Sequence, residues 1–358
     1  MTLEAVVLVG GQGTRLQPLT LRTPKPMLPF AGAPFLEHQL ARLRDSGVDH
    51  IVLATSYRPE VFHEHFGSGK DLGVRIDFMT ETEPLGTGGG IRNVARRLES
   101  GPDDPVLVLN GDVLSDHDLR AQLELHRRRD AAVTLHLVEV DDPRAFGCVP
   151  TDSHSRVTAF IEKSDAPVTN RINAGCYVFT RKVIDAIPEG RPVSVERDTF
   201  PGLLEAGEIL LGYIENSYWL DVGTPAAFVA ASCDVVTGVL ESPSMPGTPG
   251  EALILDEAIV HAGAVVNGGS VIGPRARVDA GAQVTGSVIG DGVHVQAGAN
   301  VVDSLVGRRA VIGQRTVVTA AVIGEGAMIG ANNELGAGIR IWNDIAIPDG
   351  AVRFSPLA

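Results

Sequence analysis

The sequence predicts an α/β protein: a Rossmann-like, mostly parallel sheet with flanking helices, followed by a C-terminal left-handed β-helix of hexapeptide repeats. Two observations lead to this fold class. In the first part of the chain short apolar runs alternate with amphipathic stretches, and after residue 250 aliphatic residues recur every six positions. A proline-, glycine- and serine-rich segment, 242–250, separates the two patterns. We therefore expect domains at 1–240 and 253–358, joined by a linker at 241–252.

The first domain contains short apolar runs with the length and composition of buried strands. The predicted strands are Ala5–Val9, Ile51–Ala54, Val106–Leu109 and Val133–Val138. The stretch 34–46 between the first two runs predicts a helix, because proline stands in its first turn and Gly47 follows its end. This alternation predicts βαβ units, in which ligands bind outside the carboxyl ends of the strands. The loop after the first strand is therefore the first place to look for a site.

The second domain follows a six-residue period, with glycines beside the repeated aliphatic positions. The repeated positions are Ile254, Val260, Val266, Ile272, Val278, Val284, Ile289, Val295, Val301, Val306, Ile312, Val318, Ile323, Ile329, Leu335, Ile341 and Ile347. A hexapeptide period predicts short strands, three to a coil, stacked so that these side chains fill the axis. A β-sandwich is the alternative, but it would show alternation by two rather than by six.

Composition excludes several classes of protein. The chain has 358 residues, enough for two or three domains, and 44 acidic against 30 basic residues give a net charge of −14. Such a charge repels nucleic acids and anionic membranes. The three cysteines lack the spacing of a zinc site or a disulfide framework. The opening apolar run is too short for a signal peptide or a membrane span. We expect a cytoplasmic protein with no nucleic-acid or membrane partner.

The loop after the first predicted strand is rich in glycine and carries two cations. It reads GGQGTRL at 10–16, and Lys25 follows. Glycines let backbone N–H groups approach anionic oxygens, and the cations supply full positive charge, so the natural ligand is a phosphate chain. The loop is neither a dinucleotide-binding fingerprint, because Leu16 replaces the third glycine, nor a P-loop. The predicted contacts are Gly10, Gly11, Gly13, Thr14, Arg15 and Lys25.

Residues 10–29, GGQGTRLQPLTLRTPKPMLP, resemble the signature of the sugar-1-phosphate nucleotidyltransferases. Further motifs of that family follow in order: EPLGTG at 83–88, NGD at 110–112, FG at 146–147, EK at 162–163, NAG at 173–175 and WLDVG at 219–223. The resemblance covers residues 3 to about 230, and a hexapeptide prism is also a family feature. Gln17 and Ser164 depart from the usual pattern, which leaves the local loop geometry and the leaving-group contacts open.

The resemblance implies a reaction in which mannose 1-phosphate attacks the α-phosphorus of GTP directly and in line, giving GDP-mannose and pyrophosphate. It implies catalytic roles for Arg15, Lys25, Asp112, Lys163 and Asp221. The nucleotide would also contact Gly10, Gly11, Gly13, Thr14, Glu83, Gly86, Thr87 and Asn110. The sugar phosphate would contact Gly147, Glu162, Lys163, Asn173 and Asp221. The implied cofactor is Mg²⁺ on Asp112 and Asp221.

These residue types suit that chemistry on physical grounds. The two substrates are both anions, so the site must neutralise charge and align the displacement. Lysine is rare here, at Lys25, Lys70, Lys163 and Lys182, and the first and third stand inside motifs. Asp112 and Asp221 each end a predicted strand, and carboxylates with phosphate oxygens and water suit Mg²⁺. A carboxylate at Glu83 would favour guanine, which offers N–H donors on its pairing edge.

Three alternatives stay open. One is an enzyme of the same family that takes another nucleoside triphosphate or another sugar, such as glucose 1-phosphate or heptose 1-phosphate. Another is a non-catalytic regulatory homologue, although the charged motif residues are all present. The third is an acyltransferase, but hexapeptide prisms of that kind generally need a catalytic histidine between subunits, and this half of the sequence has only His261 and His294. Exposed strand rows in such a prism favour self-association, so we expect a homo-oligomer formed through the β-helix.

Overall fold

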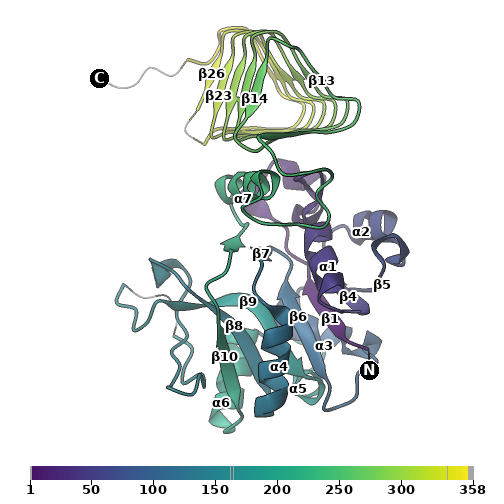
Figure 1. Cartoon of the computed structure of the whole chain (residues 1–358), viewed down its shortest axis with the longest axis vertical. Coiled ribbons are helices and arrows are strands. Elements are labelled where there is room, and N and C mark those ends of the chain that lie inside the picture. The colour runs from purple at the N-terminus through teal and green to yellow at the C-terminus, as the bar shows by residue number, and fades with distance from the viewer. Residues whose placement is uncertain (1, 162, 164, 337, 354–358) are drawn as a thin grey trace. The chain divides into compact units, whose positions relative to one another are not determined.

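The computed structural model describes residues 2–161, 163, 165–336 and 338–353 (Figure 1). The chain forms two compact units. One comprises Met1–Gly11 and Arg42–Trp219, and the other comprises Gln12–Ala41 and Leu220–Ala358. These units follow spatial proximity, whereas the predicted boundaries at 240 and 253 follow the change in sequence pattern and stay a prediction. The predicted phosphate-binding loop is thus largely part of the second unit, together with the β-helix.

The first unit is built on a seven-stranded sheet with the order β10-β8-β9-β6-β1-β4-β5. The strands are β1 (Glu4–Leu8), β4 (His50–Thr55), β5 (Arg75–Thr80), β6 (Pro105–Asn110), β8 (Val133–Glu139), β9 (Arg171–Thr180) and β10 (Leu210–Ile214). Strand β9 runs antiparallel to both of its neighbours, and the other pairs are parallel. The four strands predicted from apolar runs are all present, which confirms the mostly parallel sheet.

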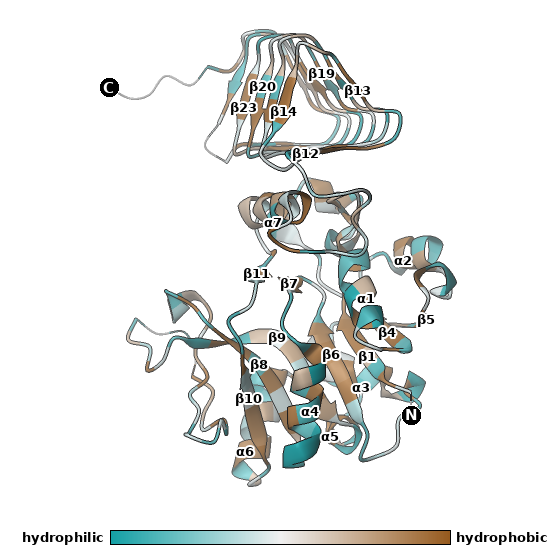
Figure 2. Cartoon of the chain, viewed as in Figure 1, coloured by the Kyte–Doolittle hydropathy of each residue, from teal (hydrophilic) through white to brown (hydrophobic). Residues whose placement is uncertain are grey.

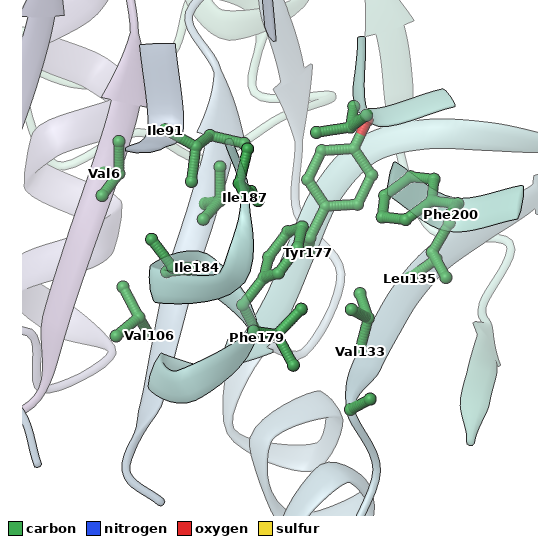
Figure 3. Packing of buried hydrophobic residues seen from close by; sticks show 14 of the residues in the cluster. Val6, Ile91, Val106, Val133, Leu135, Tyr177, Phe179, Ile184, Ile187 and Phe200 are labelled. Carbon is green, nitrogen blue, oxygen red and sulfur yellow. The ribbon is translucent and has the colours of Figure 1, made fainter. Parts of the chain in front are cut away.

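The strands of this sheet are apolar because helices cover them. Figure 2 shows β1, β6 and β8 mainly in brown, and Val6, Val108 and Leu135 in these strands are fully buried. Aromatic side chains complete the core, where Tyr177 and Phe179 of β9 pack around Phe200 (Figure 3). The polar residues that follow the strands are therefore held by a rigid scaffold.

The helices match the predicted alternation. They are α1 (Phe35–Asp45), α2 (Pro59–Phe66), α3 (Gly86–Val94), α4 (Leu119–Arg129), α5 (Arg181–Ala186), α6 (Phe200–Glu205) and α7 (Pro225–Thr237). Helix α1 confirms the predicted helix at 34–46. Asp118 caps α4 by accepting hydrogen bonds from the N–H groups of Arg120 and Ala121. Among the described residues, no helix is long and apolar enough to cross a membrane.

The second unit begins with short elements and a hairpin. They are η1 (Thr14–Leu16), η2 (Leu19–Leu21), η3 (Lys25–Met27), β2 (Pro29–Phe30) and β3 (Ala33–Pro34). The Phe30 ring packs edge-on against Phe228 of α7 with centroids 5.4 Å apart. The Ala31 N–H donates to the Ser232 hydroxyl of the same helix at 3.1 Å. The hairpin is therefore fixed to α7 by both apolar and polar contacts.

The β-helix consists of three parallel sheets, as the hexapeptide period predicts. The first holds β12 (Ala252–Ile254), β15 (Ser270–Ile272), β18 (Val288–Ile289), β21 (Leu305–Val306), β24 (Val322–Ile323) and β27 (Arg340–Ile341). The second holds β13 (Ile259–Val260), β16 (Arg277–Val278), β19 (His294–Val295), β22 (Val311–Ile312), β25 (Met328–Ile329) and β28 (Ala346–Ile347). The third holds β14 (Val265–Asn267), β17 (Gln283–Thr285), β20 (Asn300–Val302), β23 (Val317–Thr319) and β26 (Glu334–Leu335). This architecture confirms the predicted β-helix, and the sandwich alternative is wrong.

The repeated aliphatic residues fill the axis, except at its ends. Those from Ile272 to Ile341 are buried. In the first coil Val260 and Val266 are half-buried, and Ile254 is 45% exposed, so the prediction that it fills the axis is wrong. A first coil has a neighbouring coil on one side alone, and this explains the exposure.

Candidate functional site

The residues proposed to bind the ligands are divided between the two units. In the first unit, the carboxyl ends of β1 and β6 lie side by side, with Leu8 in register with Asn110. The Gly111 N–H donates to the Leu8 carbonyl at 2.9 Å, and a Cβ on Gly111 would meet that oxygen at 2.6 Å. The structure therefore brings Gly10, Asn110 and half-buried Asp112 to one edge of the sheet, as the sequence predicts.

Asn110 belongs to a chain of polar contacts that crosses to β9. A Cβ on Gly175 would meet the Asn110 Nδ2 atom at 2.8 Å, and the Tyr177 hydroxyl forms a hydrogen bond with the Asn110 side chain. Asn173 donates from Nδ2 to the Tyr177 hydroxyl at 2.8 Å and to Glu196 Oε1 at 2.6 Å. Burial raises the pKa of Tyr177, so its hydroxyl stays protonated. The side chains of Asn110 and Asn173 are thus held in fixed orientations.

The EPLGTG motif forms the entry to α3 and is held by the segment after residue 190. Gly86 has a φ of 69°, and the N–H groups of Gly88 and Gly89 donate to the Val193 carbonyl. The Thr87 hydroxyl accepts from the Val195 N–H at 3.0 Å. Glu83 is exposed. This segment has the geometry of a rigid backbone turn with one exposed carboxylate at its start.

The neighbouring carboxylate, Glu81, was not singled out from the sequence. Its Oε2 atom accepts from the Leu85 N–H at 3.3 Å. Burial raises the pKa of Glu81, against the opposing effect of that hydrogen bond. Glu81 therefore closes the turn that carries Glu83.

The residues assigned to the sugar phosphate occupy two segments of the first unit. Gly147 has a φ of 77° and follows Phe146, whose ring lies 5.6 Å from that of Trp219. The Trp219 indole N–H donates to the Ala174 carbonyl at 2.9 Å, beside Asn173. Lys163 is exposed. Glu162 and Ser164 lie outside the described residues.

In the second unit, residues 12–29 form what we call the cationic loop. Gly13 has a φ of 60°, and its carbonyl accepts from the Thr20 hydroxyl at 2.9 Å. A Cβ on Gly13 would meet the Lys25 Cβ at 2.8 Å. Lys25 is 6% exposed, whereas Thr14 is exposed. The loop folds back on itself, so a lysine that is distant in sequence lies against its first turn.

Arg15 lies against the backbone of Gly223, where a Cβ would overlap its guanidinium group. Gly223 follows Asp221 by two residues and precedes α7, which Thr224 caps by accepting from the Ala227 N–H. The structure therefore brings Arg15, Lys25 and the Asp221 segment into one unit. Glycine at 223 is required by this close approach.

Two carboxylates, those of Asp112 and Asp221, are the predicted metal ligands. Among residues the structure describes, no group of three or more His, Cys, Asp or Glu side chains could hold a metal ion. Asp112 belongs to the first unit and Asp221 to the second. Mg²⁺ is commonly held by one or two carboxylates together with substrate phosphates and water, and this donor set fits such an ion. The pairing of the two aspartates on one metal stays a prediction.

Several residues of the site were missed by sequence reasoning. Ser56 follows β4 and donates from its hydroxyl to the Gly10 carbonyl at 2.5 Å. Tyr177 and Glu196 orient Asn173, and Val193 holds the turn at Gly88. Ser56 does carry a signal in the sequence, because it comes shortly after the second predicted strand of the chain. Glu196 carries no comparable signal, because its role depends on a contact between distant segments.

The fold and the motif positions define a nucleotidyltransferase, and comparison with known proteins supports this class. The sequence pattern of the Nucleotidyl transferase family matches residues 4–238, and that of the GMPPB C-terminal domain matches residues 248–333. This chain belongs to the nucleotidyl transferase family. The family resemblance seen in the sequence is thereby confirmed.

The chain is also similar to individual known proteins, to different extents. The chain is 54% identical to the mannose-1-phosphate guanylyltransferase of Mycobacterium tuberculosis, over 98% of each protein. It is 37% identical to the mannose-1-phosphate guanylyltransferase catalytic subunit beta of Drosophila pseudoobscura, over 73% of this chain and 71% of that protein. The crystal structure of HddC from Yersinia pseudotuberculosis, complexed with GMP-PN, superposes with a TM-score of 0.55 and 30% identity. The superposition covers 64% of this chain and 98% of that one.

Proposed function

We propose that this chain joins mannose 1-phosphate to the GMP part of GTP, forming GDP-mannose and releasing pyrophosphate. The observation that carries the proposal is the 54% identity to a mannose-1-phosphate guanylyltransferase over nearly the whole of both chains. The motif residues support it, because the charged ones are all present, and among the described ones Asn110 ends β6 while Gly13 and Gly86 stand in turns with a positive φ.

The reaction is a single displacement. An oxygen of the mannose 1-phosphate attacks the α-phosphorus of GTP, and a new P–O bond forms as the bond to the β-phosphate oxygen breaks. Negative charge moves to the departing pyrophosphate, so cations fixed near that group favour the transition state. Arg15 and Lys25 fill this role in the proposal, and the burial of Lys25 strengthens its charge interactions. Lys163 holds the phosphate of the incoming sugar.

The other proposed contacts are to the phosphate chain, the nucleoside and the sugar phosphate. Gly10, Gly11, Gly13 and Thr14 present backbone N–H groups to the phosphate chain, and Gly86, Thr87 and Asn110 contact the nucleoside. Glu83 is exposed at the start of its turn, where it accepts hydrogen bonds from guanine. Gly147, Asn173 and Asp221 contact the sugar phosphate, as does Glu162, which lies outside the described residues.

Mg²⁺ is the proposed cofactor, held by Asp112 and Asp221 with phosphate oxygens and water. When bound, the ion neutralises charge on the phosphates and fixes their geometry. Members of the family generally use a divalent metal, so the choice of Mg²⁺ is the specific part of this proposal.

A cytoplasmic location and self-association through the β-helix belong to the same proposal. Val265 and Val317 in the third sheet of the β-helix, and Met328 in the second, are exposed apolar side chains. Light scattering on the purified full chain measures the oligomer. A monomer at all concentrations contradicts self-association.

The test is a matrix of substrates. Pyrophosphate release is measured with GTP, ATP, UTP, CTP and dTTP against mannose 1-phosphate, glucose 1-phosphate and heptose 1-phosphate, with and without Mg²⁺. We expect the highest kcat/KM for GTP with mannose 1-phosphate, and no turnover after chelation. A higher kcat/KM for another pair identifies a related enzyme, and no turnover with any pair favours the non-catalytic homologue.

Asp112→Asn sharpens this test. The substitution removes the negative charge of the proposed metal ligand and keeps nearly the same side-chain shape. It should therefore lower kcat/KM by about 100-fold or more. Asp116→Asn, an exposed carboxylate in the following segment, is the matched control and should stay within about twofold of wild type. Full turnover by Asp112→Asn would contradict the assignment.

A further inference from the structure

At one corner of the β-helix, the turns of successive coils carry charged residues that form a row along the β-helix. We call it the corner ladder: Arg275, Asp291, Arg308, Arg309, Glu325 and Asp344. Backbone hydrogen bonds link these turns coil by coil, from the Arg309 N–H to the Asp291 carbonyl and from the Asp344 N–H to the Glu325 carbonyl. The signs alternate along most of the ladder. Basic, acidic, basic and acidic turns follow one another before the last turn breaks the alternation.

Each early acid in the ladder is paired with arginine from the preceding coil. Arg275 contacts Asp291 at 2.5 Å, and Arg308 and Arg309 contact Glu325 at 2.9 and 2.7 Å. Asp344 follows Glu325, so its preceding coil offers another acid instead of a base. Two carboxylates at adjacent turns repel each other unless a cation stands between them.

Arg22 of the cationic loop supplies that cation. Its guanidinium contacts Asp344 Oδ2 at 2.5 Å and Glu325 Oε1 at 3.6 Å. The Glu325 side chain is 7% exposed, so removal of a cation beside it has a larger effect than at an open surface pair. Arg22 thus continues the alternation of the ladder from a different part of the chain.

Three further contacts tie the same part of the loop to the β-helix. Arg340 Nη1 donates to the Gln17 carbonyl at 3.1 Å, and Asn343 Nδ2 donates to the Pro18 carbonyl at 3.4 Å. A Cβ on Gly307 would meet the Leu19 Cδ2 atom at 2.9 Å, so Leu19 packs on that turn. Residues 17–22 are therefore held between two proposed phosphate cations, Arg15 before them and Lys25 after them.

We propose that Arg22 is a positioning residue for the nucleotide: by bridging Glu325 and Asp344 it lets the β-helix hold the cationic loop in the shape that binds the triphosphate. The proposal rests on the proposed function. A loop already held in its binding shape loses less conformational entropy when the nucleotide binds, so nucleotide affinity depends on this contact. The β-helix then acts on the reaction within its own chain, separately from any role in self-association.

Arg22→Gln in the full chain tests this, with Arg309→Gln as the matched control. Both remove a cation from Glu325, but Arg309 belongs to the β-helix itself, and its hydrogen bond and ion pair are made to Glu325 of the same β-helix. We expect Arg22→Gln to raise the KM for GTP about fivefold with a smaller change in kcat, and Arg309→Gln to leave both within about twofold. Arg22→Lys should recover most of the lost affinity, because the ammonium still reaches Asp344.

Hydrogen exchange provides a readout that needs no substrate. The N–H groups of Leu16, Gln17 and Met27 form hydrogen bonds inside the cationic loop. They should exchange about five times faster in Arg22→Gln than in Arg309→Gln, while amides in β1 exchange equally in both. Equal exchange in the loop overturns the proposal, as does an unchanged KM in Arg22→Gln or an equal rise in Arg309→Gln. A wild-type chain inactive with GTP contradicts the proposed function instead, and the exchange comparison still decides the role of Arg22.

Discussion

Gly175 lies so close to the side chain of Asn110 that no Cβ fits between them. Gly175 has a φ of 76°, and an added Cβ would stand 2.8 Å from Asn110 Nδ2 and 3.2 Å from Cγ. Asn110 ends β6 two residues before Asp112. The glycine of the NAG motif therefore fixes the position of the NGD motif on the neighbouring strand.

Gly175→Ala should displace Asn110 and, through the backbone, Asp112. We expect kcat/KM to fall by about 10- to 100-fold, because small misplacements of binding groups are costly. Gly190→Ala is the matched control: Gly190 has a φ of 72° with no atom within 4 Å of an added Cβ. Both variants should lose about 1 kcal/mol of stability from the left-handed backbone, measured by urea unfolding. Similar kinetic defects in the two would contradict the close approach as the cause.

Lys25→Met should keep the packing of the cationic loop while removing its buried charge. A methionine fills nearly the same volume, so the unfolding free energy should change by less than about 1.5 kcal/mol. Steady-state kinetics should show kcat/KM lowered by about 100- to 1,000-fold, because the cation faces the leaving group in the proposal. Lys70→Met, at an exposed position, should leave the kinetics unchanged. Normal turnover by Lys25→Met would remove this lysine from the mechanism.

Buried histidines make the stability of the first unit depend on pH. Burial lowers the pKa of His126 and His136 from 6.5 to about 4, because the protein interior disfavours the charged ring. The unfolded chain therefore binds these protons at higher pH than the folded chain does. Stability is fully present above pH 6.5 and is lost as the pH falls from about 6.5 toward about 4, by up to roughly 3 kcal/mol for each histidine.

Urea unfolding at several pH values between 7.5 and 4.5 measures this loss. His126 contacts the hydroxyls of Thr134 and Thr180, and His126→Gln offers an uncharged polar group in its place. The variant should lose less stability than wild type between pH 7 and pH 5. His63→Gln, at an exposed position, should follow the wild-type curve. Parallel curves for all three proteins would show that His126 does not titrate as described.

The β-helix should be sensitive to truncation along its axis but tolerant at its first coil. Ile312 is fully buried and Ile254 is 45% exposed, although both occupy the same place in the hexapeptide repeat. Ile312→Ala should cost about 2–5 kcal/mol of unfolding free energy, whereas Ile254→Ala should cost about 0.5 kcal/mol. Calorimetry on the full chain measures both. Equal costs would mean that the first coil is packed as tightly as the middle ones.

The sequence predicted both sheet architectures because each rests on a strong periodicity. Apolar runs marked the strands that are buried on both faces, and the six-residue repeat marked the axis of the β-helix. The end effect at Ile254 was not predictable, because the repeat looks the same in every coil until the number of stacked neighbours is known. The NGD motif likewise allowed Asn110 and Asp112 to be placed at the end of a predicted strand.

Contacts between distant segments were beyond sequence reasoning. Glu196 orients Asn173 through one hydrogen bond, and nothing in the local pattern of Glu196 indicates a partner 23 residues away. The contact of Arg22 with Asp344 spans 322 residues. Such contacts depend on how the chain folds back, which periodicity and spacing do not specify.

The most direct test of the proposed function is phosphorus NMR on the wild-type chain mixed with GTP, mannose 1-phosphate and Mg²⁺. The proposed displacement predicts that both substrate signals decline together while pyrophosphate and a new sugar diphosphate ester appear in equal amounts. Loss of GTP with the mannose 1-phosphate signal unchanged, or no change in either substrate, would contradict it.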